Sequence, residues 1–362
     1  MTTPGSRSGD RPILVAPDKF KGTLAAAEAA LSIGRGLARG GVGPIEILPV
    51  ADGGEGTMEA LVRALRGRVL ATEVSDPLGR PVEAAFGLVR DERTAIVEMA
   101  QASGLWRVAE AESDPVAAST RGTGELILAA LEAGAREVIV AAGGSATTDG
   151  GRGALEALGA SFAGRRADLT ALRRTLRGVR LSVACDVRNP MLGPDGAAHT
   201  FAPQKGADRS AVERLEKRMR DWARLARSVT SRDPADQPMA GAAGGLAGGL
   251  WAFAGADLRP GAALVLDVAG FDARARAAYV VVTGEGRLDE QTLAGKAVFE
   301  IATRARQAGV PCYAVVGTDR LDAFEHRLMN IEVEAAARDG QTASTDDVER
   351  AAARLARRLA PA

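Results

Sequence analysis

The chain has 362 residues, 46% of them hydrophobic and 25% charged, a composition typical of a globular protein long enough for two domains. Its 46 basic and 46 acidic side chains give a formal net charge of zero, which excludes the basic surface typical of nucleic-acid or anionic-membrane binding. No apolar run approaches the roughly 20 residues that span a bilayer, and the first eleven residues lack the apolar core of a signal peptide, so we expect a cytoplasmic protein.

The chain begins with two strand–loop–helix units. The apolar run Ile13–Ala16 predicts a buried strand, and Thr23 is a candidate N-cap for a helix that reaches about Arg39. A second strand is predicted over Ile45–Val50, and the loop ADGGEG leads from it into a helix that begins at Thr57. Consecutive units of this kind pair in parallel sheets.

The next part of the chain does not alternate regularly between strands and helices. From about Arg68 to Met99 the chain is rich in strand-forming residues and turns, and strands and helices then follow at irregular spacing. The clearest predicted elements are a helix near Gly124–Ala133, strands over Glu137–Ala142 and Arg180–Asp186, and a long charged helix from about Asp208 to Val229. This break in pattern predicts a separate domain of mixed α/β type.

The strand–loop–helix pattern of the first residues returns near the C-terminus. Strands are predicted over Tyr279–Thr283, Pro311–Val316 and Ile331–Ala335, with a closing helix from about Thr345 to Leu359. We therefore expect a doubly wound parallel sheet built from residues 1–68 and 275–362, with residues 69–274 inserted as a second α/β domain.

Lysine is rare and unevenly placed. The chain has five lysines, against 41 arginines, and four of the five lie in glycine-rich segments: Lys19, Lys21, Lys205 and Lys296. Only Lys217 lies on an ordinary charged helix. A compact ammonium group fits closer to a phosphate or carboxylate than a planar guanidinium group does. The alternative explanation is codon drift that left a few lysines unchanged.

Polar side chains follow four predicted strands at their carboxyl ends, where open α/β sheets bind ligands. They are Asp18, Lys19 and Lys21 after the first strand, Asp52 and Glu55 after the second, Asp186 and Asn189 after LSVAC, and Glu285, Arg287 and Asp289 after YVVVT. Carboxylates and ammonium groups together suit phosphoryl transfer, because the acids hold Mg²⁺ or accept a hydroxyl proton and the cations neutralise phosphate. Each residue taken singly is as well explained as a cap or turn residue.

The glycine-rich segment Ala142–Gly151 (AGGSATTDGG) is the best candidate for a phosphate-binding loop, because consecutive backbone N–H groups near a helix start bind anions. A tight strand-to-helix turn that needs glycine only for its backbone conformation explains the segment equally well. The motifs GxxxxGK[ST] and GxGxxG do not occur in the sequence.

Eight segments, in this order along the chain, resemble the bacterial glycerate kinase family that lacks a P-loop. They are APDKFKGTLAA, ADGGEGT, DPLGRPV, GGSATTDGG, ACDVRNPMLGPDGAA, FAPQKGA, AGAAGGL and TGEGRLDEQTLAGK. Thr148, Ala202 and Ala297 depart from the residues that the family commonly has. The resemblance covers most of residues 13–300 and implies phosphorylation of D-glycerate with ATP and Mg²⁺. It also implies a mixed α/β domain inserted into a Rossmann/flavodoxin-like domain, with the active site in the cleft between the two.

The resemblance carries roles onto individual residues. It implies Asp186 as the general base, with Lys19 and Lys205 as catalytic cations beside glycerate or the γ-phosphate. It further implies substrate contacts from Lys21, Asn189 and Arg287, and nucleotide contacts from Gly143, Gly144, Ser145, Thr147 and Lys296. Asp52, Glu285 and Asp289 are the candidate Mg²⁺ ligands, in no order of preference.

Other functions remain open at this point. A nucleotide-dependent oxidoreductase is disfavoured because no dinucleotide fingerprint occurs, and a non-catalytic sensor of a small acid would not need Asp186. Within the kinase interpretation, the 2-phosphate product is favoured, while the 3-phosphate product and other hydroxy-acid substrates stay open. We expect small-molecule partners only, and the sequence leaves self-association open.

Overall fold

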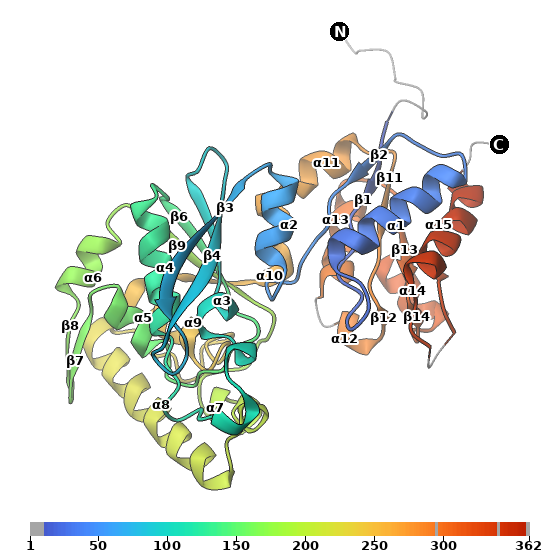
Figure 1. Ribbon diagram of the computed structural model, residues 1–362. Coiled ribbons are helices and arrows are strands. Elements are labelled where there is room, and N and C mark those ends of the chain that lie inside the picture. The colour runs from blue at the N-terminus through green and yellow to red at the C-terminus, as the bar shows by residue number, and fades with distance from the viewer. Residues whose placement is uncertain (1–10, 294–295, 339–340, 360–362) are drawn as a thin grey trace. The chain divides into compact units, whose positions relative to one another are not determined.

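The chain folds into two compact units, which Figure 1 shows in a computed structural model that describes residues 11–293, 296–338 and 341–359. One unit is formed by the chain up to Asp52 and from Ala262 onward, and the other by Gly53–Gly261. Both junctions lie before the boundaries expected at 68/69 and 274/275. Packing explains the shift: a Cβ atom at Gly87 would lie 2.4 Å from Val62, so the helix that carries Val62 belongs to the second unit.

The first unit contains a five-stranded sheet in which every neighbouring pair is parallel, in the order β15-β13-β11-β1-β2. Its strands are β1 (Ile13–Val15), β2 (Ile45–Ile47), β11 (Val280–Thr283), β13 (Cys312–Val316) and β15 (Ile331–Ala335). The two ends of the chain thus share one sheet, as the strand pattern predicted. The short pair β12 (Arg287–Leu288) and β14 (Thr318–Asp319) lies beyond the strand ends of this sheet.

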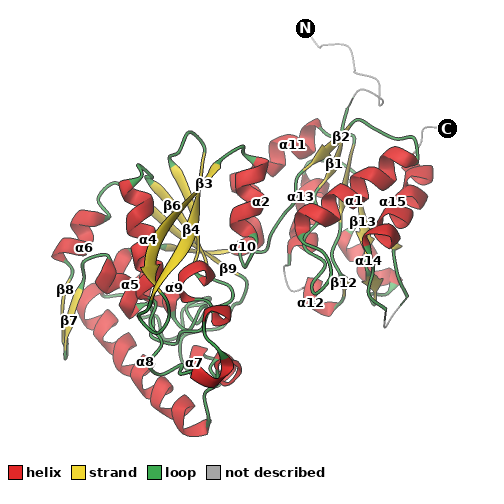
Figure 2. Cartoon of the chain, viewed as in Figure 1, coloured by secondary structure: helices red, strands yellow, loops and turns green. Residues whose placement is uncertain are grey.

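Helices accompany these strands (Figure 2). They are α1 (Ala26–Arg39), α10 (Gly261–Ala269), α11 (Phe271–Ala277), α12 (Glu290–Leu293), α13 (Ala297–Gln307), α14 (Ala323–Met329) and α15 (Thr345–Leu359). Helix α1 begins later than expected, after Ala25, whose amide donates to the Glu28 carboxylate at 2.9 Å. Thr23 does not cap it, because the Thr23 hydroxyl donates to the carbonyl oxygen of Phe20.

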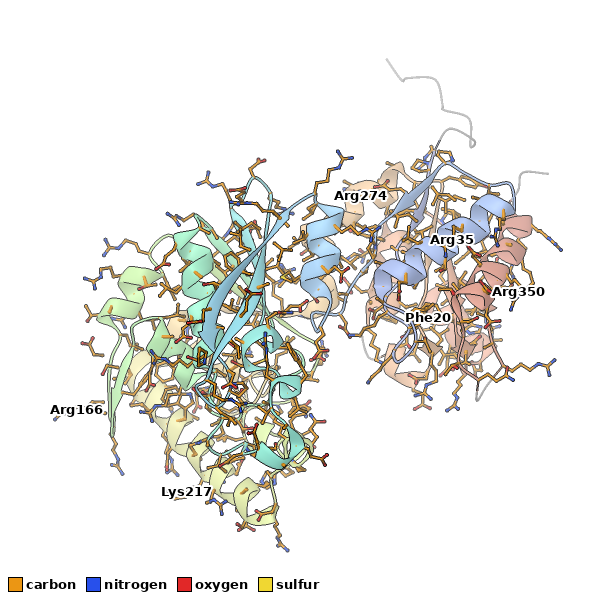
Figure 3. The ribbon with its side chains drawn as sticks, viewed as in Figure 1. Phe20, Arg35, Arg166, Lys217, Arg274 and Arg350 are labelled. Carbon is orange, nitrogen blue, oxygen red and sulfur yellow. The ribbon has the colours of Figure 1, made fainter. Side chains whose placement is uncertain are left out.

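Helices α1 and α15 pack closely because glycine lines the contact. A Cβ atom at Gly36 would lie 2.3 Å from the carbonyl oxygen of Glu349, and one at Gly40 would lie 2.2 Å from Ala356 Cβ. The buried Glu349 carboxylate pairs with Arg35, labelled on α1 in Figure 3, and with Arg39 at 2.9 Å. Larger residues at either glycine would force the helices apart, so this contact fixes α15 against the first half of the unit.

The second unit contains a six-stranded sheet in the order β10-β9-β6-β5-β4-β3, in which β10, β9, β6 and β5 are parallel and β4 and β3 are antiparallel. The strands are β3 (Arg68–Ser75), β4 (Pro81–Val89), β5 (Thr94–Glu98), β6 (Glu137–Ala141), β9 (Arg180–Cys185) and β10 (Asp257–Pro260). A separate hairpin joins β7 (Ser161–Ala163) and β8 (Arg166–Asp168). The mixed sheet agrees with the α/β class predicted for the inserted domain.

The helices of this unit are α2 (Thr57–Ala64), α3 (Ala100–Ser103), α4 (Arg121–Glu132), α5 (Arg152–Ala157), α6 (Thr170–Thr175), α7 (Ala197–Phe201), α8 (Arg209–Thr230) and α9 (Leu246–Ala254). Short 3₁₀ turns lie at Leu105–Arg107, Glu110–Glu112 and Pro203–Lys205. Across the described ranges of both units, no helix has the length and apolar character needed to cross a membrane.

The two ends of the inserted segment lie together. Gly53 has a φ of +92°, and a Cβ atom added to it would lie 2.8 Å from the Cα atom of Gly261. Glycine is therefore required at this point for both its backbone conformation and its close approach.

Candidate functional site

Charged side chains gather at the strand ends of the first unit. Asp18 and Lys19 follow β1, and Asp52 follows the strand β2, which is paired with β1 in parallel register. The Lys19 ammonium group lies 3.4 Å from an Asp52 carboxylate oxygen, while the Lys19 amide donates to Asp18 at 2.7 Å. Glu285 follows the other neighbour of β1, so three adjacent strands bring their polar residues to one edge.

Two of these carboxyl groups are buried and electrostatically crowded. Burial, followed by the negative charge of Asp52, raises the pKa of Asp18 from 3.8 to about 7. Burial likewise raises the pKa of Glu285 to about 7, with contributions from Asp289 and Asp52, although a 2.6 Å hydrogen bond from the Thr292 hydroxyl opposes the rise. Burial and the neighbouring carboxylates therefore both favour the protonated form of these two groups.

The loop after β11 supplies the remaining polar groups of this edge. Arg287 is half-exposed and pairs with Asp289 at 3.2 Å. Lys296 is the residue before α13, and its positive charge opposes the rise in the pKa of Glu285. Lys21 lies exposed on the loop after β1, and a Cβ atom at Gly286 would lie 3.0 Å from the Lys21 amide nitrogen. The two loops therefore touch through their backbones.

The glycine loop of the second unit is held by backbone contacts on several sides. The Gly144 carbonyl accepts from Leu105 at 2.8 Å, and the Ala146 amide donates to Ser103 at 3.0 Å. Gly144 has a φ of +72°, and a Cβ atom there would lie 2.2 Å from a carboxylate oxygen of Glu55. Gly144 is exposed, whereas Thr147 and Thr148 are fully buried. The loop is thus a rigid turn that stays accessible at Gly144, beside the Glu55 carboxylate.

The predicted helix start behind this loop is already capped from within the chain. The Asp149 carboxylate accepts from the amides of Gly151 at 3.0 Å and Gly153 at 3.1 Å. It also accepts from the amide and the hydroxyl group of Thr120. The amides at the start of α5 are therefore occupied by Asp149, and the part of the loop that can meet an anion is its glycine side.

Lys205 supports the loop from beneath. Its ammonium group donates to the Ser145 hydroxyl at 2.7 Å and to the Thr147 carbonyl at 2.6 Å. The side chain is only 2% exposed, and burial lowers the pKa of Lys205 from 10.5 to about 7, a shift that nearby Asp149 opposes. Lys205 therefore belongs to the second unit, where it holds the glycine loop, and Lys19 belongs to the other unit.

Asp186 and Asn189 follow β9, the strand next to β6, at the same sheet edge as the glycine loop. The Ala142 amide donates to the Ala184 carbonyl at 3.1 Å, so the two strand ends stay paired up to these loops. Asp186 is exposed, and the Asn189 amide group donates to the Asp195 carbonyl at 2.7 Å. Asn189 thus holds its own loop in shape, and Asp186 is accessible to a ligand.

The predicted site residues consequently form two groups, one in each unit. The first unit holds Lys19, Lys21, Asp52, Glu285, Arg287, Asp289 and Lys296; the second holds Gly143, Gly144, Ser145, Thr147, Asp186, Asn189 and Lys205. Asp18 stands at the same strand end as Lys19 and has the more strongly perturbed carboxyl group. The sequence placed Asp18 directly after a buried strand, which marked it as a possible site residue. Its burial in the folded unit distinguishes it from the other acidic residues at the strand ends.

The acidic edge of the first unit has a donor set that suits a partial magnesium site. Among the residues placed in the structure, no three His, Cys, Asp or Glu side chains are arranged to hold a metal ion by themselves. Mg²⁺ usually takes one or two carboxylates and completes its shell with phosphate oxygens and water. Burial, with a smaller contribution from neighbouring carboxylates, raises the pKa values of Asp18 and Glu285, and a bound cation would oppose that rise.

Comparison with known proteins gives concordant matches. The model of the glycerate kinase family matches residues 13–361. The chain is 42% identical over 336 residues to a glycerate kinase of Bacillus subtilis (strain 168), covering 87% of this chain and 88% of the relative. It is 38% identical over 325 residues to the glycerate 2-kinase of Escherichia coli (strain K12), covering 84% and 85%.

A crystal structure assigned as glycerate kinase 2 from Salmonella typhimurium LT2 matches with a TM-score of 0.84 and 37% identity, over 96% of each chain. Because the match covers nearly the full length of both chains, it includes residues of both units.

Proposed function

The chain belongs to the glycerate kinase family, and on this premise we propose that it transfers the γ-phosphoryl group of ATP to the 2-hydroxyl group of D-glycerate, with Mg²⁺. It is a glycerate kinase. The proposal adds the nucleotide, the metal ion, the hydroxyl group that is phosphorylated and the roles of individual residues. The observation that carries it is the glycine loop with the buried ammonium of Lys205 behind it, beside the exposed carboxylate of Asp186. The relative named glycerate 2-kinase supports the 2-position.

The glycine loop receives the nucleotide phosphates in this proposal. Backbone N–H groups of Gly143, Gly144 and Ser145 face the anion at the open side of the loop, where a side chain at Gly144 would not fit. Thr147 is fully buried, so it shapes the loop from below. Lys205 is a positioning residue that holds Ser145 and Thr147 while adding positive charge. Lys296 is proposed to neutralise nucleotide phosphate through its ammonium group.

Asp186 acts as the general base. It accepts the proton of the attacking hydroxyl group of glycerate as the new O–P bond forms and the bond from the γ-phosphorus to the bridging oxygen of ADP breaks. General base catalysis of this kind is typically worth roughly 10²–10⁴-fold in rate. Its position at the end of a buried strand fixes the backbone, and its exposure gives access to substrate. Lys19, Lys21 and Arg287 bind the glycerate carboxylate or the transferred phosphoryl group through their positive charge, and Asn189 holds the loop that carries Asp186.

Asp52, Glu285 and Asp289, with Asp18 beside them, would hold the Mg²⁺ ion. A bound Mg²⁺ ion offsets negative charge on the phosphate oxygens during phosphoryl transfer. Lys19 pairs with Asp52 and so keeps that carboxylate oriented toward the strand end.

The test is ADP release measured with a coupled assay on the full chain, with D-glycerate, ATP and Mg²⁺. Glycerate-dependent turnover is expected, and ³¹P NMR of the product is expected to identify 2-phosphoglycerate. Folded protein that binds glycerate without turnover would instead support the sensor hypothesis. A product phosphorylated at the 3-position would refute the regiochemistry while leaving the kinase assignment intact.

A further inference from the structure

A second concave site lies on the inserted unit, along helix α8 and beside the β7–β8 hairpin. It is a groove of about 410 Å³, within the range of roughly 300–1,000 Å³ that is usual for small-molecule sites. None of the residues proposed above for phosphoryl transfer lines it. Figure 3 shows Lys217, one of the lining residues, projecting from α8.

The groove is rich in positive charge. Its charged lining consists of four cationic and two acidic side chains: Arg152, Arg214, Lys217, Arg218, Asp149 and Asp221. The acids are engaged, since Asp149 accepts from backbone amides and Asp221 pairs with Lys217 at 3.1 Å and with Arg224 at 3.3 Å. Arg152 in turn pairs with Glu156 at 2.8 Å, so the four lining cations outnumber the carboxylates around them. The groove therefore presents a net positive surface to an incoming ligand.

Aromatic rings form its apolar wall. Phe162 and Trp222 meet edge to face with their centroids 4.7 Å apart, and the Trp222 indole donates to the Gly150 carbonyl at 2.9 Å. These contacts fix both rings, and the Arg152 guanidinium lies over Phe162 at 5.8 Å. A fixed apolar wall beside cations suits a ligand with a planar ring and an anionic group.

Arg218 distinguishes the groove from an ordinary solvated helix face. Its guanidinium group donates to the Val116 carbonyl at 2.7 Å and to the Thr148 carbonyl, which lies in the glycine loop. Its Nε atom is buried without a hydrogen-bond partner among the residues that the structure places, and burial lowers the pKa of Arg218. A solvated surface arginine would show none of these features, so the polar end of the groove is built into the fold.

We propose that this groove is a second small-molecule site, which binds an organic phosphate that bears a planar ring and does not take part in phosphoryl transfer. The phosphate is held by Arg214, Lys217 and Arg218, and the ring packs on Phe162 and Trp222. Arg218 and Asp149 join the groove to the glycine loop, so occupancy of one bears directly on the backbone of the other.

Labelling with pyridoxal 5′-phosphate tests the proposal on the full chain, independently of kinase activity. This compound has a pyridine ring, an aldehyde and a phosphate on a methylene group. Its aldehyde condenses with a lysine amine to an imine and water, and borohydride reduces the imine to a stable amine. The chain has only five lysines, so peptide mass analysis resolves each one. We expect saturable labelling of Lys217, weakened about tenfold in Arg214→Ala, the scale of one lost charge-assisted hydrogen bond.

The matched control is Arg209→Ala on the same helix, because Arg209 is 95% exposed and pairs only at 3.5 Å with Glu213. Lys217 labelling is expected to be unchanged in that variant, and Lys19 labelling in the other unit serves as the internal reference. Equal Lys217 labelling in wild type and Arg214→Ala would overturn the proposal.

Discussion

The Lys205 ammonium group donates a 2.6 Å hydrogen bond to the carbonyl oxygen of Thr147, within a region that excludes water from the lysine almost completely. A side chain that the sequence marked as a ligand-facing cation is thus also part of the scaffold of the glycine loop. Charge and stability are consequently coupled at this residue.

The first prediction concerns pH. Because burial lowers the pKa of Lys205 from 10.5 to about 7, the unfolded chain binds more protons than the folded chain between those values. The contribution of Lys205 to the free energy of unfolding is therefore constant below about pH 7 and rises as the pH increases toward 10.5. Urea unfolding at pH 7, 8 and 9 should show this rise in wild type and lose it in Lys205→Met. The control Lys217→Met, at an exposed lysine, should keep the wild-type slope; identical slopes in all three proteins would contradict the assignment.

The second prediction concerns the base. Asp186→Asn should lower kcat by about 10²-fold or more, because the amide cannot accept the hydroxyl proton. Asp195→Asn is the matched control, since Asp195 is an exposed carboxylate on the same loop that contributes its backbone carbonyl to Asn189. Steady-state kinetics in both substrates separate kcat from KM. A near wild-type kcat for Asp186→Asn would refute the role of Asp186, whatever happens to KM.

The third prediction concerns the glycine loop. Gly144→Ala places a methyl group 2.2 Å from the Glu55 carboxylate in a backbone with φ +72°, so the KM for ATP should rise about tenfold or more as the loop distorts. Gly178 has the same φ of +72° but nothing within 4 Å of an added Cβ atom. Gly178→Ala should therefore cost only about 1–2 kcal/mol of stability, with unchanged KM. Equal kinetic effects from the two variants would remove the case for a loop at the nucleotide.

The fourth prediction uses the five lysines as a series. Arginine at Lys19, Lys21, Lys205 or Lys296 should lower kcat/KM, because the larger planar group cannot occupy the space of an ammonium group. Lys205→Arg should also unfold at lower urea concentration, since Lys205 is 2% exposed and donates two hydrogen bonds under 3 Å. Lys217→Arg, exposed on α8, should turn over glycerate like wild type. If all five variants behave alike, codon drift explains the rarity of lysine.

The fifth prediction concerns a buried hydroxyl group. Thr148 Oγ1 is buried with no hydrogen-bond partner among the placed residues, so Thr148→Val should leave stability unchanged or raise it by about 1 kcal/mol. Thr123 is equally buried, but its hydroxyl pairs with Ser103 at 2.8 Å, so Thr123→Val should cost about 1–3 kcal/mol. Thermal and urea unfolding of both variants check the difference. A loss in Thr148→Val as large as that in Thr123→Val would show that Thr148 has a partner after all.

The sequence predicted the strand ends of the first unit to within three residues, and Ile331–Ala335 without any difference, because buried parallel strands read as short apolar runs between turn signals. Helix α15 was predicted over Thr345–Leu359 and is found there, since its apolar residues recur at helical spacing. The start of α1 was less accessible, because the cap uses the side chain of Glu28 rather than that of Thr23. The sequence around residues 23–28 was compatible with more than one N-terminal cap for this helix.

The electrostatics of the site could not be read from the sequence. Lys205 is buried partly by the segment around Ser113, whose hydroxyl donates to the Lys205 carbonyl from 92 residues away. Arg218 likewise lies on a helix whose charged residues suggested a solvated face, yet it bonds to Val116 and Thr148. Burial by distant segments is a tertiary property, and the pKa values that follow from it have no local signal.

The meeting of Gly53 with Gly261 has a consequence for how such a protein is assembled and altered. Because the two ends of the segment lie together, it can be inserted where a tight loop would connect two strands of the first unit. Those strands need not move apart to accommodate it. Residues 53–261 can accordingly be exchanged as one cassette between relatives by recombination at two sites. Chimeras cut there should inherit the glycine loop and the groove along α8 from one parent and the acidic strand edge from the other.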